Sequence, residues 1–360
     1  MTATTVIQHA SSLDVLAAIP ASLGFHPVDS LVLCGVNPPR GRLGAMMRFD
    51  IAALGGRAAA PLIDRNVRRV RDAGAAAVFA VRYAGAGAPR MDRDPAVAAA
   101  LARVRSVLPI VGLWSVGEGK LAEHHPVTGE PVGPAIHAER LQSTRAAAAL
   151  VVNGLAPLAR REDLARIELA PEAARRAARI AERRAADQAV ATAKDKLGPW
   201  RLALLGCWDE CLAQTLADPS TEPTPTKAGR IHALVCDPRG RDAILATPFK
   251  GSDEAPRRIA LGRGGTAILD PFGSRGVDHD RATAALAVMA RVLAHVSKRR
   301  RGHGYAAGAA WHWWLGSGAA AADWARSALD CSNAPDLATL LLTLLEHEVF
   351  PSAVTGLRSR

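Results

Sequence analysis

The sequence has few aromatic residues and no apolar run long enough to cross a membrane. Aromatic residues make up only 4% of the chain, whereas alanine and arginine are abundant, a bias that weakens any inference from charge alone. No window approaches the ~18 uninterrupted apolar residues of a membrane span. The first residues, MTATTVIQHASSLD, lack a basic region followed by an apolar stretch. We therefore expect neither a membrane span nor a secretory signal.

Cysteines are few, odd in number and far apart. The five are Cys34, Cys207, Cys211, Cys236 and Cys331. Free thiols in a reducing compartment explain this pattern best, so the sequence predicts a cytoplasmic protein. Cys207 and Cys211 lie one helical turn apart, but two further metal ligands are missing at any useful spacing. We expect them to be buried as small apolar side chains.

Short catalytic and nucleotide-binding motifs are also absent. The chain contains no Gly-x-Ser-x-Gly elbow, no P-loop and no His-Glu-x-x-His. Gly85 and Gly87 follow an expected strand, but Arg90 stands where a dinucleotide fingerprint requires glycine. The sequence therefore gives no support to the commonest hydrolase, nucleotide-binding and metalloprotease classes.

Apolar residues make up 49% of the 360 residues, enough for a substantial core. In the first third, short apolar runs alternate with helical patterns. The expected strands are 4–7, 30–36, 43–51, 76–83 and 109–116, with 119–123 pairing back on the last. The expected helices are 13–23, 61–72 and 94–107. Because a hairpin links two of the strands, the sequence predicts an N-terminal layered mixed-sheet α/β domain over residues 1–137.

Beyond residue 137 the pattern is mostly helical, which predicts a helical C-terminal lobe over residues 138–360. The expected helices are 138–153, 171–197, 200–216, 231–245, 282–296, 306–315, 319–330 and 335–347. A polar Pro/Thr stretch at 219–229 is expected to be a linker. The tryptophans at 311, 313, 314 and 324 fall at helical spacings, and we expect them in the core of the hairpin formed by the helices 306–315 and 319–330 rather than in a stacking platform.

Several stretches resemble a known family. AIPASLGFHPVDSLVLCGV (residues 18–36) and the later RFDI resemble the start of domain-of-unknown-function family 4192, uncharacterised proteins mostly of actinobacteria. The resemblance continues through NGLAPLARREDLARIELAP, GRDAILA and AAWHWWLGSGAAAADWARSALD, so it spans nearly the whole chain. It implies no activity.

The resemblance also implies paired cysteines at a point where this chain has His124 and His125. A zinc site is one interpretation of the segment 114–133, with histidines as substitute ligands. Neighbouring histidines on an extended chain point to opposite sides, and no set of four ligands is visible. We therefore favour a surface hairpin and expect no metal.

The joint between the first expected helix and the strand 30–36 is the candidate ligand-binding site. Arg48 and Asp50 share one face of a strand, and the hairpin should return them to the level of Asp29. We predict a corner of His26, Asp29, Arg48 and Asp50, with Arg48 as the anchor, because guanidinium groups recognise phosphate and carboxylate. Trp114 is included as a further ligand-binding residue. The alternative is that His26 and Asp29 only shape the turn and that the arginine forms a structural ion pair.

The formal net charge is +11, but basic residues are spread through several helices. The compact basic run, SKRRRGHG (297–304), is expected to be a solvated loop rather than a phosphate-binding loop. We favour a non-catalytic binding or regulatory protein for an anionic ligand or protein partner, acting through the corner. The alternatives are an enzyme on a small phosphorylated or carboxylated substrate, with His26 as acid/base, and a nucleic-acid-associated protein. No cofactor is expected, and no catalytic residue is assigned.

Overall fold

The computed structural model describes residues 11–38, 42–85, 94–152, 157–192, 196–249, 254–263, 276–347, 349 and 351. The chain divides into two compact units, unit 1 up to Asp163 and unit 2 from Leu164 to Leu357. The division comes later than the predicted boundary at residue 137, because helices of the intervening segment pack on the first helix of unit 1. The expected strand 4–7 lies outside the described residues.

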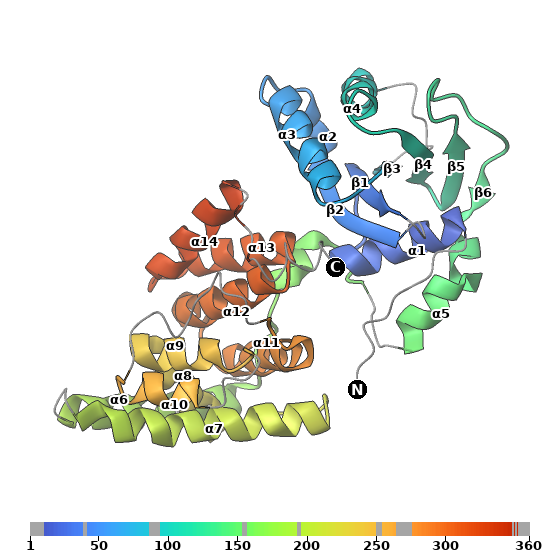
Figure 1. Ribbon diagram of the computed structural model, residues 1–360. Helices are drawn as coiled ribbons and strands as arrows, with labels where there is room; N and C mark the ends of the chain where they lie inside the picture. Colours follow the sequence, from blue (N-terminus) through green and yellow to red (C-terminus); the bar gives the residue numbers. More distant parts are fainter. Residues whose placement is uncertain are drawn as a thin grey trace. The chain divides into compact units, whose positions relative to one another are not determined.

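Unit 1 is a mixed β-sheet with helices on both faces, as the sequence predicts (Figure 1). The strands are β1 (Ser30–Asn37), β2 (Arg42–Asp50), β3 (Ala77–Tyr83), β4 (Ile110–Gly117), β5 (Lys120–His124) and β6 (Ile136–His137). The helices are α1 (Ser12–Leu23), α2 (Ile51–Leu54), α3 (Ala59–Asp72), α4 (Pro95–Arg105), η1 (Ala138–Ser143) and α5 (Arg145–Val152). The order of the strands is β2-β1-β3-β4-β5-β6, and β3 and β4 are parallel.

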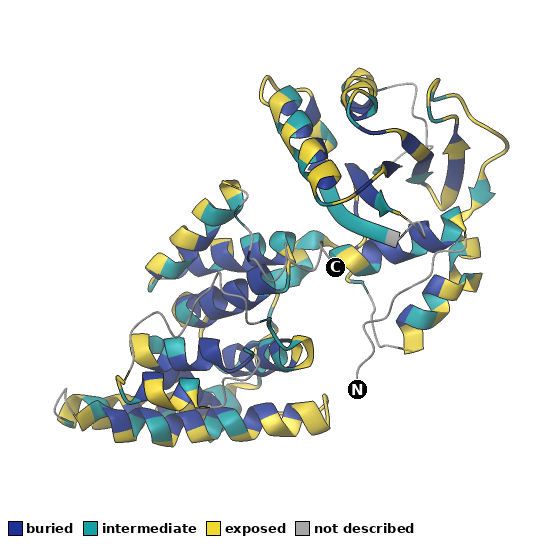
Figure 2. Ribbon diagram, viewed as in Figure 1, coloured by how far each residue is buried: buried dark blue, intermediate teal, exposed yellow. Residues whose placement is uncertain are grey.

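Alternate residues of the central strands serve two separate cores. On β1, Leu31 and Leu33 pack with α3 and α4, whereas Val32 and Cys34 pack with α1 on the opposite face. This follows from the two-residue period of a strand, whose successive side chains point to opposite faces. Both faces of β1 are covered, which is why its sequence is apolar from Leu31 to Cys34 (Figure 2).

Unit 2 is helical. Its helices are η2 (Arg161–Ala165, at the division), α6 (Glu172–Ala191), α7 (Leu197–Ala217), α8 (Pro225–Cys236), α9 (Pro238–Ala246), α10 (Ala255–Ala260), α11 (His279–Ala294), η5 (Lys298–Arg300), α12 (Gly302–Trp314), α13 (Gly318–Leu329) and α14 (Asp336–Glu346). No helix among the described residues is long and apolar enough to span a membrane.

Several helices begin, end or divide at other residues than the sequence predicts. The predicted linker 219–229 is only partly a loop, because Thr224 caps the N-terminus of α8 and Pro225 begins that helix. The predicted helix 231–245 is two helices, since Pro238 cannot continue α8 and instead begins α9. The predicted helix 138–153 is divided into η1 and α5.

The core of unit 2 is built around tryptophans, as expected. Trp208 and Trp311 stack with their ring centroids 5.6 Å apart, and Trp324 is buried against α12. A Cβ on Gly308 would overlap the Trp324 ring, so glycine is required for α13 to approach α12 this closely. The helix α12 is buried along almost its whole length (Figure 2), which explains why its sequence has no polar face.

Candidate functional site

The predicted corner lies where β1 begins and β2 ends. Ser30 pairs with Asp50, and Val32 pairs with Arg48, in the antiparallel register of the two strands. The prediction that the hairpin returns Arg48 and Asp50 to the start of β1 is therefore confirmed.

Arg48 is engaged within the protein on two sides. Its Nη2 donates to Oδ1 of Asp50 at 2.5 Å, and its guanidinium carbon lies 5.6 Å from the centroid of the Phe25 ring. That distance fits a cation–π contact. The Arg48 side chain is only 15% exposed. These contacts are those of a structural tie between β2 and the joint that follows α1.

Asp29 is engaged elsewhere. Its Oδ1 accepts a hydrogen bond from the backbone N–H of Gly85 at 2.7 Å, just beyond the end of β3. Because β1 lies between β2 and β3, this bond is on the opposite side of β1 from Arg48. Asp29 has a φ of 44°, and its carbonyl accepts from the N–H of Ile51 at 2.9 Å. Asp29 therefore holds three chain segments together at this end of the sheet.

The other two predicted site residues have opposite surroundings. His26 is exposed, and its backbone N–H donates to the carbonyl of Leu158 at 2.9 Å. Trp114 is only 6% exposed and packs in the core between the sheet and α1. The structure thus brings Arg48 and Asp50 together, leaves the His26 imidazole in solvent and buries Trp114.

The two neighbouring histidines point to opposite sides of the β4–β5 hairpin, as expected. His124 is buried, with Nε2 2.7 Å from the hydroxyl of Ser115 and Nδ1 3.0 Å from the carbonyl oxygen of Gly129. His125 is exposed, and its Nδ1 accepts from the backbone N–H of Thr128 at 3.2 Å. Over the part of the chain that the structure describes, no three His, Cys, Asp or Glu side chains are placed to hold a metal ion.

The basic run before α12 is less available than the sequence suggests. Arg300 binds the carboxylate of Glu182, with Nη2 2.5 Å from Oε1. Arg301 is 1% exposed, and its guanidinium donates to two backbone carbonyls. The expectation of a solvated loop therefore fits Lys298 and Arg299, whereas the next two arginines have structural contacts.

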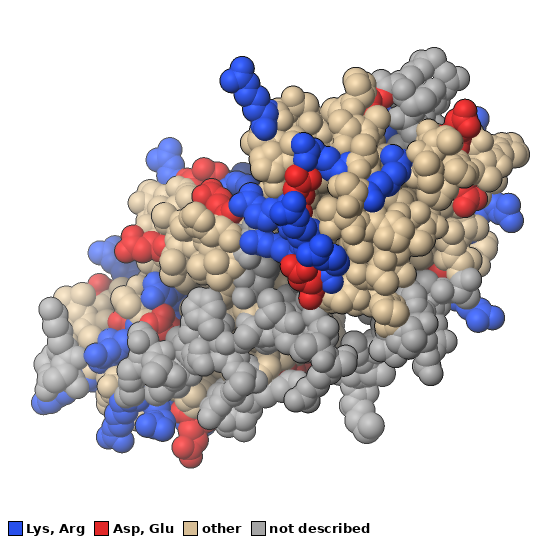
Figure 3. Space-filling view, turned by 45° about the horizontal axis from the view of Figure 1, so that its top comes forward, with Lys and Arg blue, Asp and Glu red and all other residues tan. Residues whose placement is uncertain are grey.

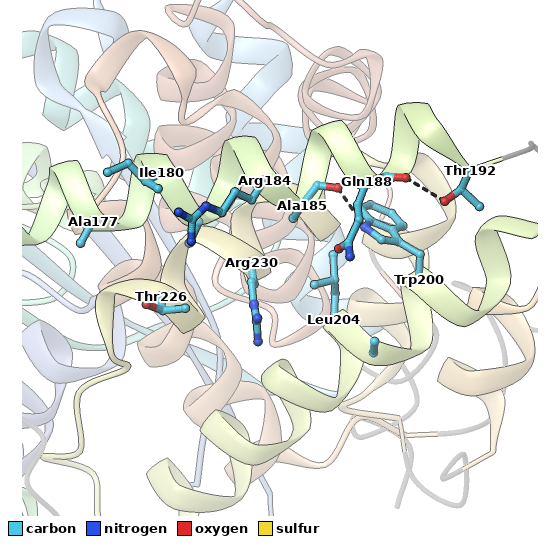
Figure 4. Close-up of a pocket in the computed structure, with 12 residues that line it drawn as sticks. Ala177, Ile180, Arg184, Ala185, Gln188, Thr192, Trp200, Leu204, Thr226 and Arg230 are labelled. Carbon is cyan, nitrogen blue, oxygen red and sulfur yellow. Dashed lines mark hydrogen bonds between the residues drawn. The ribbon is translucent and has the colours of Figure 1, made fainter.

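A groove of about 620 Å³ opens elsewhere, between α6, α7 and α8 of unit 2 (Figure 4). The helix α8 lies beside both other helices, whereas α6 and α7 contact each other little. The residues that line the groove are Ala177, Ile180, Ala181, Arg184, Ala185, Gln188 and Thr192 of the α6 segment, Trp200, Ala203 and Leu204 of α7, and Thr226 and Arg230 of α8.

Two arginines from different helices extend into this groove. Figure 4 shows Arg184 of α6 and Arg230 of α8 beside the same opening, with Trp200 and Gln188 further along it. Both arginines are exposed, and neither has an acidic partner among the described residues. The indole of Trp200 is fixed, because its Nε1 donates to the carbonyl of Ala185 at 3.0 Å. The groove therefore combines free positive charge with a rigid aromatic ring.

Close packing of α6 on α8 shapes the groove. A Cβ on Gly229 would overlap the backbone of α6 at Ala178, so only glycine permits this approach. Beneath the same contact, Nδ1 of the buried His232 lies 2.7 Å from Oε1 of Glu182, which also binds Arg300.

The charges of this buried pair are set by its surroundings. Burial alone would lower the pKa of His232, but its hydrogen bonds to Cys236 and Glu182 raise that pKa to about 10. Burial would raise the pKa of Glu182, yet its bonds to His232 and Arg300 lower that pKa. At neutral pH the pair is an imidazolium and a carboxylate. An ion pair therefore fastens α6 to α8 behind the groove.

This groove could not be predicted from the sequence. The residues of α6 that line it recur at three- and four-residue spacings, from Ala177 to Gln188, but half of them are alanines. Alanine is compatible with a buried face and with an exposed one. The one signal was Ile180, an apolar residue among arginines on a face that would otherwise be solvated.

Comparison with known proteins gives one match. The model of a family described as a domain of unknown function (DUF4192) matches residues 13–261. No curated protein and no solved structure matches the chain.

Proposed function

The chain belongs to the DUF4192 family, whose description states no activity. From the groove, we propose that it is a non-catalytic binding protein for an anionic ligand or partner. The observation behind this proposal is that Arg184 and Arg230 meet at one groove without acidic partners among the described residues. The proposal keeps the function that the sequence favours and moves its site from unit 1 to unit 2.

Guanidinium chemistry supports an anion as the ligand. An arginine presents a planar set of donors that matches a carboxylate or phosphate. Arg48 already donates to Asp50, whereas neither Arg184 nor Arg230 has an acidic partner in the described part of the chain, so both can donate to a ligand. Gln188 and Thr226 add neutral hydrogen-bonding groups, and Trp200 adds an apolar surface. A cavity of this size lies in the usual range for ligand sites.

The lining of the groove favours binding over catalysis. None of its described lining residues is a histidine, cysteine, aspartate, glutamate or lysine. A general acid or base, or a covalent nucleophile, is most often drawn from these residue types. The enzyme alternative rested on the corner, where the contacts of Arg48 and Asp29 within the protein favour a structural role.

We further propose a cytoplasmic location. All five cysteines are free, three of them buried in the two units. Free thiols of this kind fit a reducing compartment.

The test measures how far anions stabilise the unmodified protein, one double variant and one single control variant. Inorganic phosphate, citrate and poly-glutamate are added separately to the full-length chain, and the unfolding temperature is recorded. A ligand at a hundred times its Kd stabilises the folded protein by about 2.7 kcal/mol. We expect Arg184→Gln with Arg230→Gln to abolish the stabilisation. Arg179→Gln, on the same helix but outside the groove, should preserve it.

Two outcomes would contradict the proposal. One is that none of the three anions stabilises the unmodified protein. The other is that the double variant and the Arg179 variant lose stabilisation equally, which would mean that the anions act on overall charge. In the second case, basic side chains outside the groove, such as those on the face in Figure 3, explain the effect.

A further inference from the structure

The groove has an apolar strip as well as a positive charge, and Ile180 lies toward one end of it. Ile180 is 46% exposed, high for a branched apolar side chain in the middle of a helix. Ala177, Ala181 and Ala185 continue its side of α6 along the groove, and Leu204 of α7 lies across from them. Small side chains on the groove leave room for another backbone to come close. An apolar strip of this form is typical of a helix-binding groove.

Arginines surround this strip. In a helix, the neighbours of residue 180 on the surface are residues 176, 177, 183 and 184, and three of these four are arginines. Arg176, Arg183 and Arg184 are exposed, and none has an acidic partner among the described residues. Arg230 adds a fourth charge from α8. Arg184 and Arg230 therefore line the groove beside its apolar strip, and Arg176 and Arg183 lie next to Ile180 on the surface of α6.

We propose that the groove binds an acidic amphipathic helix of a partner protein. This inference rests on the proposed function and names its ligand. The apolar face of the partner helix covers Ile180 and the alanines, while its carboxylates pair with Arg184, Arg230 and the neighbouring arginines. The lining from Ala177 to Thr192 extends over about 22 Å at 1.5 Å per residue, which matches a helix of about four turns.

Other ligands use this surface less completely. A small anion such as phosphate reaches one pair of arginines but leaves Ile180 and most of the strip uncovered. A nucleic acid pairs its phosphates with arginines, yet its backbone gains nothing from the apolar strip. An acidic amphipathic helix uses both the charge and the apolar residues, so charge complementarity and burial favour the same partner.

The experiment uses a set of labelled helical peptides of about sixteen residues. In each, leucine, isoleucine or phenylalanine occupies positions i, i+3, i+4 and i+7, and glutamate fills most other positions. Three controls are the same composition in scrambled order, the same pattern with lysine for glutamate, and a single-stranded oligonucleotide. Binding to the full-length chain is measured by fluorescence anisotropy at two salt concentrations.

We expect at least one patterned acidic peptide to bind more than about tenfold more tightly than its scrambled and basic controls. Ile180→Asn should weaken that binding about tenfold or more, because it places a polar group in the apolar strip. The matched control is Val190→Asn, since Val190 is 88% exposed on the same helix but does not line the groove. It should change affinity less than about twofold. Arg184→Gln with Arg230→Gln should weaken binding and reduce its salt dependence.

The outcomes separate this inference from the proposed function. If phosphate, citrate or poly-glutamate stabilises the protein through Arg184 and Arg230 while no patterned peptide outperforms its scrambled control, the groove binds anions and the helix inference is wrong. If neither anions nor peptides bind, both proposals are wrong. Tighter binding of the oligonucleotide than of every acidic peptide, sensitive to the arginines but not to Ile180→Asn, also overturns the helix inference.

Discussion

In unit 1, the Arg48 side chain is only 15% exposed, donates to Asp50 and lies over the Phe25 ring. In unit 2, Arg184 and Arg230 are exposed at one groove. Neither of the groove arginines has an acidic partner among the described residues. An arginine side chain thus forms a structural contact in unit 1 and is an unpaired charge at the groove of unit 2. Its neighbours decide which, because a guanidinium already bonded to a carboxylate offers fewer donors to a ligand.

The surroundings of the two sites differ in a second way. The corner of unit 1 is closed by backbone hydrogen bonds from Ile51 and Gly85 to Asp29. The groove of unit 2 is open because α6 and α7 both pack on α8 and contact each other little. We infer that a polar cluster at the end of a sheet is a weaker sign of a ligand site than unpaired charge beside an open groove. Four predictions test this difference, from the largest expected effect to the smallest.

The largest effect should follow from Gly229→Ala. A Cβ at this position overlaps the backbone of α6, so α6 and α8 must separate and the groove loses its shape. We expect unit 2 to lose about 3 kcal/mol of stability in urea unfolding. The control is Gly206→Ala in α7, where a Cβ meets nothing within 4 Å. That change should stabilise the protein by about 0.5–1 kcal/mol. Equal effects of the two substitutions would show that the close contact is not required.

The second prediction compares the two kinds of arginine directly. Arg48→Met removes an ion pair and a cation–π contact, so we expect a loss of about 1–2 kcal/mol in the unfolding of unit 1. Arg230→Met should change stability by less than about 0.5 kcal/mol, because this arginine has no acidic partner among the described residues. If Arg230→Met were the more destabilising, the distinction between tie and free charge would be wrong.

The third prediction concerns alkaline pH. The pKa of His232 is raised in the folded protein to about 10, above its usual 6.5. A raised pKa means that its stabilisation is complete below pH 6.5 and is lost as the pH rises toward 10. We therefore expect the free energy of unfolding of unit 2 to fall between about pH 7 and 10. His232→Gln should remove most of this decline, and an unchanged decline in that variant would assign it to other groups.

The smallest effect is expected in the basic run before α12. Replacing all four basic residues would also remove the ion pair of Arg300 and the buried contacts of Arg301. Only Lys298→Gln with Arg299→Gln is a clean change, and we expect less than about 0.5 kcal/mol in stability. Gel-shift assays at low salt should show no difference in nucleic-acid binding. A clear loss of binding in this variant would restore nucleic acid as a partner through this run.

Much of unit 1 could be predicted from local patterns. The apolar runs of β1 and β3, the hairpin to β2 and the Ser11 cap of α1 are all encoded within a few residues of each other. The pairing of Ser30 with Asp50 followed from hairpin geometry. The bond from Gly85 to Asp29 could not be predicted, because it joins residues 56 positions apart through the order of the strands.

Most helices of unit 2 were also predictable, but which of their side chains contact one another was not. The tryptophan spacing predicted the core around α12. The roles of Arg300 and Arg301 were hidden, since one contacts Glu182 across 118 residues and the other contacts distant carbonyls. A run of four basic residues looks uniform in sequence until the fold assigns each one a neighbour.

By itself, the sequence determined most of the order of strands and helices along the chain, the mixed sheet and the residue types available for binding an anion. Periodicity and capping act over one or two turns, so they can be detected without knowing the fold. Only the tertiary structure decided that Arg48 is bonded to Asp50 while Arg184 and Arg230 stand free of acidic partners among the described residues. Whether a charge is satisfied depends on side chains brought near it by packing, and in unit 2 that depends on a glycine, Gly229, which lets α8 approach α6.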